Sequence, residues 1–182
     1  MTRFPKAYAD TVQRLRVPLG FLLLAAFAWF AQPTLRSVVW GVPVAIAGLL
    51  LRGWAAGHLE KNKKLVDSGP YAWVRNPLYV GSLVAALGLA LAAKRPLLAW
   101  LFFLFFYFVY LPVVEQEEQH LRKLFPDFAA YERRVRMFWP TIPRGESLTH
   151  FRWDLFWRNE EYKASLAFLV ALGFLFWRAT AN

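Results

Sequence analysis

The sequence predicts an all-α protein, an integral membrane helical bundle with four to five transmembrane helices. Three observations support this fold class. Hydrophobic residues make up 58% of the 182 residues, the apolar residues gather in five uncharged runs, and the charged residues fall between these runs. Ordinary soluble proteins contain about 45–50% apolar residues. The length indicates one domain over residues 1–182.

The five uncharged runs set the expected helices. They cover residues 17–35, 37–51, 76–93, 96–114 and 164–177. A membrane span needs about 20 apolar residues, with roughly 17 as the lower end. The first, third and fourth runs meet this length. The second does so if Arg52 extends its charged end to the membrane surface and the helix continues to Ala56. The fifth run is marginal, so a re-entrant or interfacial helix is an alternative there.

The positive charges predict the orientation. The net charge is +10, and 18 of the 22 lysines and arginines lie in residues 1–16, 52–75 and 115–163, which an alternating topology places on one side. Positive charge collects on the cytoplasmic face of membrane proteins. We therefore expect a prokaryotic inner-membrane protein with these three segments, the N-terminus included, in the cytoplasm. Charges that alternate in register with apolar runs exclude a nucleic-acid partner, and membrane lipids are the expected surroundings.

Several kinds of site are excluded by composition. Because the chain has no cysteine, it has no disulfide, no thiolate nucleophile and no cysteine metal site. The three histidines, His58, His120 and His150, match no short zinc motif, and His120 is expected at the surface. We predict no metal site. The polar start of the chain, before residue 17, carries no signal-peptide cleavage pattern.

The stretch "SGPYAWVRNPLYVG", residues 68–81, contains two glycines, two prolines, two tyrosines, an arginine and an asparagine. A simple connection between helices needs none of these. Gly69-Pro70 indicates a turn. Asn76 is a natural N-cap, and Pro77 suits the first turn of the helix that follows. Such a helix N-terminus offers free N–H groups to an anionic ligand group. The alternative is a capped interfacial loop anchored by its tyrosines.

Three glutamates follow directly on the fourth apolar run: Glu115, Glu117 and Glu118. Glu118 can pair with Arg122 four residues later, which would make part of the cluster a solvated face. Glu117 has Leu121 at the same spacing and therefore lacks this partner. Acidic groups at a membrane edge are costly unless they serve a site or find partners, so Glu117 is the candidate for a binding role.

Together the two segments show a family pattern. "LVDSGPYAWVRNPLYVG" followed by "EEQHLRKLFPDFAAYERRVRMFWP" resembles the isoprenylcysteine carboxyl methyltransferase and phospholipid methyltransferase group of membrane enzymes. The resemblance covers about residues 52–140. It implies S-adenosylmethionine as methyl donor, held in a cytoplasmic cofactor pocket between the two segments. By position, the implied cofactor contacts are Lys63, Lys64, Leu65, Val66, Tyr71, Asn76, Pro77, Leu78, Tyr79 and Glu117.

Two positions depart from the family pattern. Asn76 stands where the pattern usually has histidine, and Val113 stands where the isoprenylcysteine enzymes carry an arginine four residues before the aligned glutamate. An arginine there suits bidentate recognition of a carboxylate. We therefore expect an amine, a lipid headgroup or another lipophilic or amphiphilic methyl acceptor rather than prenylcysteine.

Methyl transfer from a sulfonium is an in-line displacement, so positioning supplies most of the catalysis. Arg75 and Glu118 are the candidate catalytic helpers where the acceptor loses a proton. Tyr107 and Tyr110 either line the acceptor's path or face lipid as belt residues. Two other functions stay open: an NADPH-dependent membrane reductase of the sterol or steroid type, and a non-enzymatic membrane scaffold whose basic loops bind anionic lipid. Ser82 after Gly81, where the reductases commonly have an acidic residue, favours the methyltransferase.

Overall fold

The computed structural model describes residues 4–143 and 150–181. In these residues the chain is helical, without a strand. Five long helical segments form the bundle: α1 (Lys6–Phe30), α2 (Leu35–Ala56), α4 (Pro77–Ala92), the continuous segment α5 (Pro96–Phe105), η1 (Phe106–Tyr110) and α6 (Leu111–Leu124), and α9 (Glu161–Ala181). Three short helices connect them: α3 (Pro70–Trp73), α7 (Phe128–Arg134) and α8 (Trp153–Arg158).

The helix lengths confirm a membrane bundle but change the roles of two runs. Among the described residues, α1, α2, the 29-residue segment Pro96–Leu124 and α9 are long and apolar enough to cross a membrane. The marginal fifth run extends to a helix of 21 residues, because residues 161–163 and 178–181 continue the helix on either side of it. The third run forms the 16-residue α4, which is shorter than a full span. The first helix begins at Lys6, well before the apolar run at residue 17.

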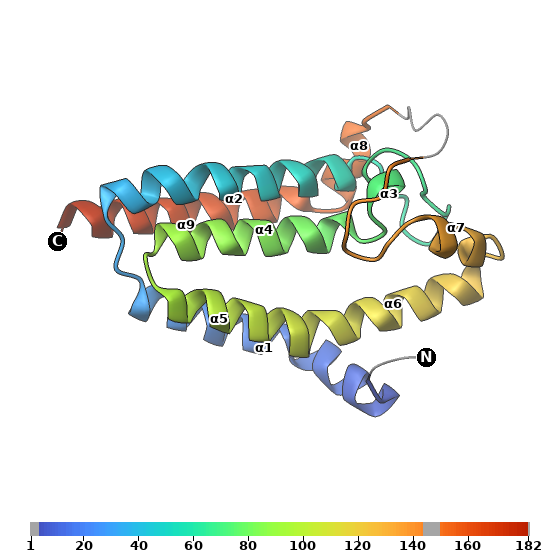
Figure 1. Cartoon of the computed structure of the whole chain (residues 1–182), viewed down its shortest axis with the longest axis horizontal. Helices are drawn as coiled ribbons and strands as arrows, with labels where there is room; N and C mark the ends of the chain where they lie inside the picture. The colour runs from blue at the N-terminus through green and yellow to red at the C-terminus, as the bar shows by residue number, and fades with distance from the viewer. Residues whose placement is uncertain (1–3, 144–149, 182) are drawn as a thin grey trace.

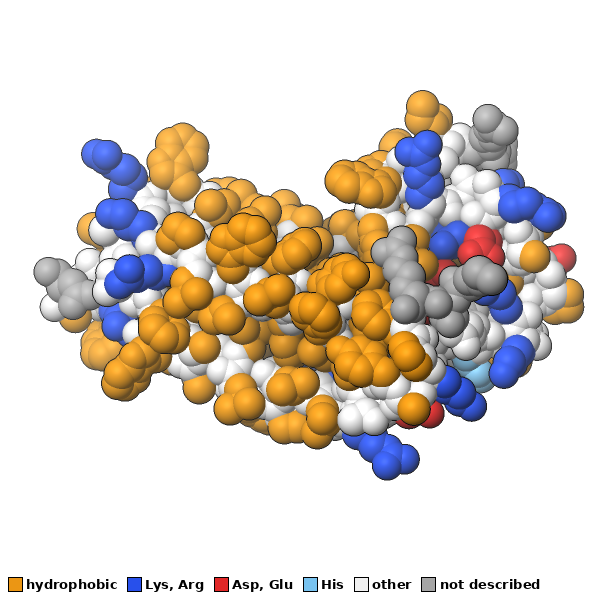
Figure 2. Space-filling model, turned by 60° about the horizontal axis from the view of Figure 1, so that its bottom comes forward, with side chains coloured by type: hydrophobic (Ala, Val, Ile, Leu, Met, Phe, Trp, Pro, Cys, Tyr) orange, Lys and Arg blue, Asp and Glu red, His pale blue; other side chains and the backbone are white. Residues whose placement is uncertain are grey.

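Figure 1 shows two layers, with α2, α4 and α9 above and α1 and the α5–α6 segment below. The start of α1, the short helices α3, α7 and α8, and the end of α6 all lie at one end of the bundle. In Figure 2, hydrophobic side chains cover the middle of the visible face, and lysines and arginines gather toward its two ends. The segments that the charge pattern predicts to share one side therefore lie together.

The contact between α2 and α4 depends on glycines that recur every seven residues in both helices, Gly41 and Gly48 in α2 and Gly81 and Gly88 in α4. Residues seven apart share one helix face. A Cβ added at Gly48 would lie 2.5 Å from the carbonyl oxygen of Gly81, and one at Gly41 would lie 2.5 Å from that of Gly88. The two backbones therefore touch, as small residues allow in membrane helices.

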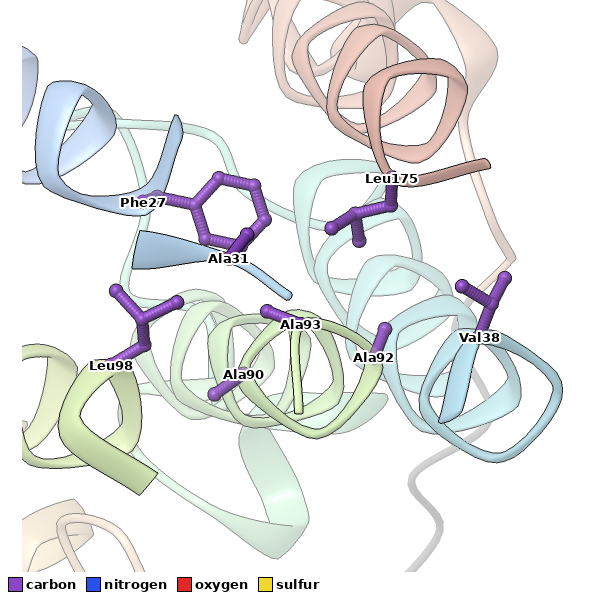
Figure 3. Close-up of a cluster of buried hydrophobic side chains, with 8 residues drawn as sticks. All are labelled: Phe27, Ala31, Val38, Ala90, Ala92, Ala93, Leu98 and Leu175. Carbon is purple, nitrogen blue, oxygen red and sulfur yellow. The ribbon is translucent and has the colours of Figure 1, made fainter. Parts of the chain in front are cut away.

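The opposite end of the bundle holds the largest apolar cluster. It is drawn in Figure 3, and its buried members are Phe27, Ala31, Val38, Ala90, Ala92, Ala93, Leu98 and Leu175. They come from α1, α2, α4, α5 and α9 or the turns beside them, so this cluster joins the two layers far from the short helices.

Pro112 explains an irregular turn in the long α5–α6 segment. Proline has no N–H, so it cannot donate to the carbonyl of Phe108 four residues earlier. Residues Phe106–Tyr110 form a π-helical turn there, and the Tyr8 hydroxyl from α1 donates to the Phe108 carbonyl at 2.8 Å. Such turns are frequent at functional sites, and this one brings Tyr110 to the cavity described next.

Candidate functional site

A cavity of about 900 Å³ lies at the end of the bundle that carries the short helices. Its walls come from α1, the end of α2 and the following loop, α3 with the start of α4, and α6 with α7. Ligand pockets in proteins range over about 300–1,000 Å³. The cavity is therefore large enough for a nucleoside-sized cofactor.

The turn before α3 needs glycine for two reasons. Gly69 has a φ of +57°, a conformation that side chains with a Cβ rarely adopt. A Cβ there would also lie 2.7 Å from the ring of His58, which is buried and contacts the Trp54 carbonyl oxygen through Nδ1 at 2.8 Å. The turn thereby starts α3, which places Tyr71 against the cavity.

Tyr71 presents an unused donor to the cavity. Its side chain is 7% exposed, and its buried hydroxyl has no hydrogen-bond partner in the described structure. Burial, reinforced by the nearby Tyr131 and Glu117, raises the pKa of Tyr71 well above its ordinary value. The hydroxyl therefore stays protonated. A buried donor without a partner is rare in proteins, and a bound ligand with an acceptor atom would satisfy it.

Arg75 and Glu118 form a buried bidentate ion pair. Arg75 Nε lies 3.0 Å from Glu118 Oε1 and Nη2 lies 3.1 Å from Oε2, and the two side chains are 8% and 5% exposed. The predicted pairing of Glu118 with Arg122 is wrong, because Glu118 is paired with Arg75 whereas Arg122 pairs with Glu132. Glu118 is therefore not part of a solvated acidic face.

Asn76 occupies the N-cap position of α4, but the prediction that its side chain caps the helix is wrong. Its amide donates to Glu118 Oε1 at 2.8 Å instead. Capping would require the Asn76 side-chain oxygen to accept from a backbone N–H of α4. The charge-assisted bond from the Asn76 NH2 group to the Glu118 carboxylate turns the side chain toward α6 instead. Pro77 stands at the first turn of α4 as predicted and is fully buried.

The same segment is joined to α7 and to Val135, the residue that follows it. Arg75 Nη1 donates to the carbonyls of Glu132 and Val135 at 3.0 and 3.2 Å, and the Tyr131 hydroxyl donates to the Tyr71 carbonyl at 2.8 Å. Arg75 thus connects three elements, α3–α4, α6 and α7. This network fixes two walls of the cavity relative to each other.

Glu117 faces the cavity on the neighbouring side of α6 and accepts a hydrogen bond from the Tyr79 hydroxyl. It has no ion-pair partner within the described ranges, in contrast to Glu118. A carboxylate with spare acceptor capacity at a cavity can bind hydroxyl or ammonium groups of a ligand.

The cavity brings together ten of the twelve predicted site residues. Those that line it are Lys64, Leu65, Val66, Tyr71, Arg75, Asn76, Leu78, Tyr79, Glu117 and Glu118. Lys63 and Pro77 do not line it; Lys63 is exposed, and Pro77 is buried behind the first turn of α4. Of the two tyrosines left open by the sequence, Tyr110 lines the cavity, whereas Tyr107 is 41% exposed and packs on Phe4 and Phe103.

Sequence reasoning missed the contribution of α2 and α9. Arg52 does not extend to the membrane surface as predicted. It lines the cavity and forms a bidentate pair with Glu161, which is 5% exposed, at 2.6 and 2.9 Å. Arg52 also donates to Ser82 Oγ. The pair forms because α9 begins beside the end of α2, and no local sequence signal indicates this packing.

The structure also locates two of the histidines that were considered as metal ligands, His120 and His150. His120 is exposed, as predicted. Over residues 4–143 and 150–181, no group of three or more His, Asp or Glu side chains could hold a metal ion. His150 lies at the start of the second described range and is exposed.

Residues 38–127 match the phospholipid methyltransferase family. The cobalt-zinc-cadmium resistance protein CzcN of Cupriavidus metallidurans is 36% identical over 135 residues, which are 72% of this chain and 61% of that protein. The protein-S-isoprenylcysteine O-methyltransferase of Schizosaccharomyces pombe is 28% identical over 144 residues, 76% of this chain and 61% of that enzyme. The human enzyme of the same name is 29% identical over 125 residues, 65% of this chain and 44% of the enzyme.

The chain thus spans about three fifths of the length of the two relatives from Cupriavidus and Schizosaccharomyces. No solved structure matches it. These comparisons confirm the resemblance predicted from the two motifs. The family match begins at residue 38, earlier than the predicted 52, and ends at residue 127, before the predicted Pro140.

Proposed function

We propose, because residues 38–127 belong to the phospholipid methyltransferase family, that this chain is an integral membrane methyltransferase that uses S-adenosylmethionine. One structural observation carries the proposal: both segments of the family pattern meet at a single cavity, to which Tyr71 offers an unused donor and Glu117 an acceptor. When bound, S-adenosylmethionine supplies an electrophilic methyl group.

The chain's own residues fit such a ligand. Tyr71 is neutral and donates, which suits a carboxylate or a ring nitrogen. Glu117 accepts, which suits ribose hydroxyls or an ammonium group. Leu65, Val66 and Leu78 supply apolar walls. We assign Lys64 and Asn76 to the same site, and we place Lys63 and Pro77 behind it, where they shape the loop and the first turn of α4 rather than touch the ligand.

Arg75 and Glu118 act in this proposal as positioning residues. They saturate each other's charges and hold α3, α4, α6 and α7 together. A bidentate pair that is more than nine-tenths buried is poorly suited to exchange protons with an acceptor. Methyl transfer needs alignment more than acid–base help, so a rigid wall is the contribution that this pair makes.

The acceptor is proposed to be lipophilic or amphiphilic. The relatives from Schizosaccharomyces and human are named as enzymes that methylate S-isoprenylcysteine in proteins, an apolar substrate with a polar end. The first-mentioned relative is named for metal resistance. On the described residues of this chain, no group of three or more His, Asp or Glu side chains could hold a metal ion.

Calorimetric titration of the detergent-purified protein tests the cofactor assignment. S-adenosylhomocysteine should bind with a micromolar Kd, about −8 kcal/mol, and NADPH should not. Mass spectrometry of the denatured protein should detect any co-purified ligand. Binding of NADPH without binding of the sulfur ligand would instead make the protein a membrane reductase.

The orientation of the site is proposed from the charge distribution, with the cavity end in the cytoplasm. Because the chain lacks cysteine, single cysteines report accessibility cleanly. Lys61→Cys at the cavity end should react with a membrane-impermeant maleimide only after the cells are opened, and Lys94→Cys at the other end should react in intact cells. The reverse pattern would invert the topology.

A further inference from the structure

A short apolar loop, residues 137–143, follows α7. Its sequence "MFWPTIP" contains no charged residue. Trp139 is 74% exposed and Ile142 is 84% exposed, at least as much as Trp40 at 74%, which faces outward from the spanning helix α2. Trp73 of α3 is also exposed, and its carbonyl accepts from the Thr141 N–H at 2.7 Å. Contiguous apolar patches on a protein surface mark contacts with a protein, a ligand or a membrane.

The start of this loop is fixed beside the first turn of α4. The Arg75 N–H donates to the Arg136 carbonyl at 2.9 Å. The Asn76 amide group donates to the Met137 carbonyl at 3.5 Å. In Figure 1 the chain after α7 accordingly runs back to the start of α4. The depth of the loop in the membrane therefore follows from the depth at which α4 begins.

Two helix lengths place the loop within the hydrocarbon layer. Lys94 and Arg95, between α4 and α5, mark the membrane surface at the other end of the bundle. From there the 16 residues of α4 extend about 24 Å, less than the roughly 30 Å of a hydrocarbon core. Along the neighbouring helix, Phe106 lies about 15 Å from Pro96. The ring of Phe138 packs on that of Phe106 with 5.5 Å between the centroids, so the loop reaches membrane depth.

The backbone of the loop is suited to this depth. Irregular backbone is tolerated within a membrane only where its polar groups find partners inside the protein or in a water-filled cavity. The Arg136 N–H donates to Thr141 Oγ1 at 3.1 Å, which closes the loop on itself, and the Thr141 N–H donates to the Trp73 carbonyl. Pro140 and Pro143 have no N–H to satisfy. The loop thus bonds these backbone groups inward while it presents apolar side chains outward.

We propose that the loop 137–143 is a membrane anchor, whose Trp139 and Ile142 insert into the lipid leaflet at the cavity end of the bundle. Lipid is the partner because the contact of Phe138 with Phe106 makes the patch continuous with the surface of a spanning segment. Tryptophan suits the boundary between headgroups and acyl chains. The anchor holds the first turn of α4, and with it one wall of the cavity, at the membrane surface. It does not depend on the methyltransferase function.

Fluorescent labels on single cysteines test the anchor, because the chain has no cysteine of its own. Trp139→Cys and Ile142→Cys are each labelled with the dye NBD in phosphatidylcholine vesicles. Both labels should be quenched by lipids that carry a nitroxide on the acyl chain, about as strongly as a label at Trp40→Cys, the lipid-facing reference in α2. Iodide on both sides of the bilayer should quench them severalfold less than a label at Lys63→Cys, the water-facing reference.

A second substitution in the labelled Trp139→Cys protein tests whether the apolar side chains hold the loop in the leaflet. A carboxylate among acyl chains is costly, so Ile142→Asp should lose most of the nitroxide quenching and gain iodide quenching. Ile142→Leu should keep the pattern of the protein with Ile142. Because Ile142 is 84% exposed, both variants should keep its thermal stability in detergent, which separates loss of membrane contact from misfolding.

Three results would overturn the anchor. Iodide quenching at positions 139 and 142 equal to that at position 63 would place the loop in water. Protection of both labels from iodide and from nitroxide lipid would show that protein, such as a second copy of this chain, covers the patch. Full nitroxide quenching in Ile142→Asp would show that the apolar side chains do not hold the loop in the leaflet.

Discussion

The two sides of α4 make different kinds of contact. Toward α2, glycines bring two backbones into contact, so a single methyl group has no room at Gly48. Toward α6, the first turn of α4 faces a cavity of about 900 Å³ that is lined by charged and aromatic side chains. The close contact with α2 fixes α4 as a rigid wall, which lets its other side stay open for a ligand.

The cavity walls formed by α3, α4, α6 and α7 lack such backbone contact and need other interactions to hold them in place. Arg75 and Glu118 provide them, because their buried pair and the bonds of Arg75 to two carbonyls tie three elements together. A pair of this kind persists only when nearly all its hydrogen-bonding groups are satisfied. On the cavity side, polar connections therefore do what backbone contact does on the α2 side.

The largest expected effect comes from breaking this connection. Glu118→Ala leaves the Arg75 guanidinium buried without its carboxylate, and removal of one partner of a buried ion pair costs about 3–5 kcal/mol. Unfolding in detergent with a titrated denaturant measures the loss. Asp67→Ala removes the carboxylate of the half-exposed Arg134 pair and should cost less than about 1 kcal/mol. Similar losses in both variants would contradict the structural role of the Arg75–Glu118 pair.

The α2–α4 contact should respond next. Gly48→Ala places a Cβ against the backbone of Ala85 and Gly81, and overpacking of this kind costs about 1–3 kcal/mol. The same substitution at Gly173 meets open space and should stabilise its helix by up to about 1 kcal/mol. Thermal unfolding of the two variants side by side gives the difference. A stable Gly48→Ala protein would show that α2 and α4 are not in backbone contact.

The sequence predicted much of this arrangement because the signals were local. Apolar runs and charge bias predicted the spanning helices and the segments that share one end. The motif at residues 68–81 and Glu117 predicted two walls of the cavity, because both carry special residues at fixed spacings. The ends of the helices were predicted less well, because the apolar runs do not mark them: α9 is longer than its apolar run, and α4 is shorter than a membrane span.

The remaining features depend on which helices become neighbours. Arg52 turns inward because Glu161, 109 residues later, begins a helix beside it. The Asn76 side chain does not cap α4, because it donates a hydrogen bond to Glu118 on α6 instead. The α1 wall of the cavity carries no motif at all. The glycine interval of seven in both α2 and α4 was a usable signal of close packing, but only when the two helices are considered as a pair.

On the cavity side, Glu117→Gln should weaken binding of S-adenosylhomocysteine by roughly ten- to a hundredfold. The amide keeps the shape but loses the charge, and hydrogen bonds to charged groups contribute about 1.5–3 kcal/mol. Calorimetry measures the affinity. Glu115→Gln, on the same helix but outside the cavity, should change it little. Equal affinities in both variants and the parent would remove Glu117 from the proposed site.

The smallest effect, and the most specific, is expected from Tyr71→Phe. Because the Tyr71 hydroxyl has no partner in the described structure, its removal should leave the ligand-free protein as stable as the parent. Tyr131→Phe removes a hydroxyl that donates to the Tyr71 carbonyl at 2.8 Å, and it should cost about 0.5–1.5 kcal/mol of unfolding free energy.

Affinity for S-adenosylhomocysteine should show the opposite order. Tyr71→Phe should lose about two- to tenfold, which corresponds to one neutral hydrogen bond, and Tyr131→Phe should lose less. Because burial raises the pKa of Tyr71, the hydroxyl stays protonated below that pKa, and the affinity ratio of parent to variant should be constant between about pH 6 and 9. If Tyr71→Phe instead destabilises the ligand-free protein and leaves affinity unchanged, the hydroxyl serves the fold, and the cavity loses the donor that most directly indicates a ligand.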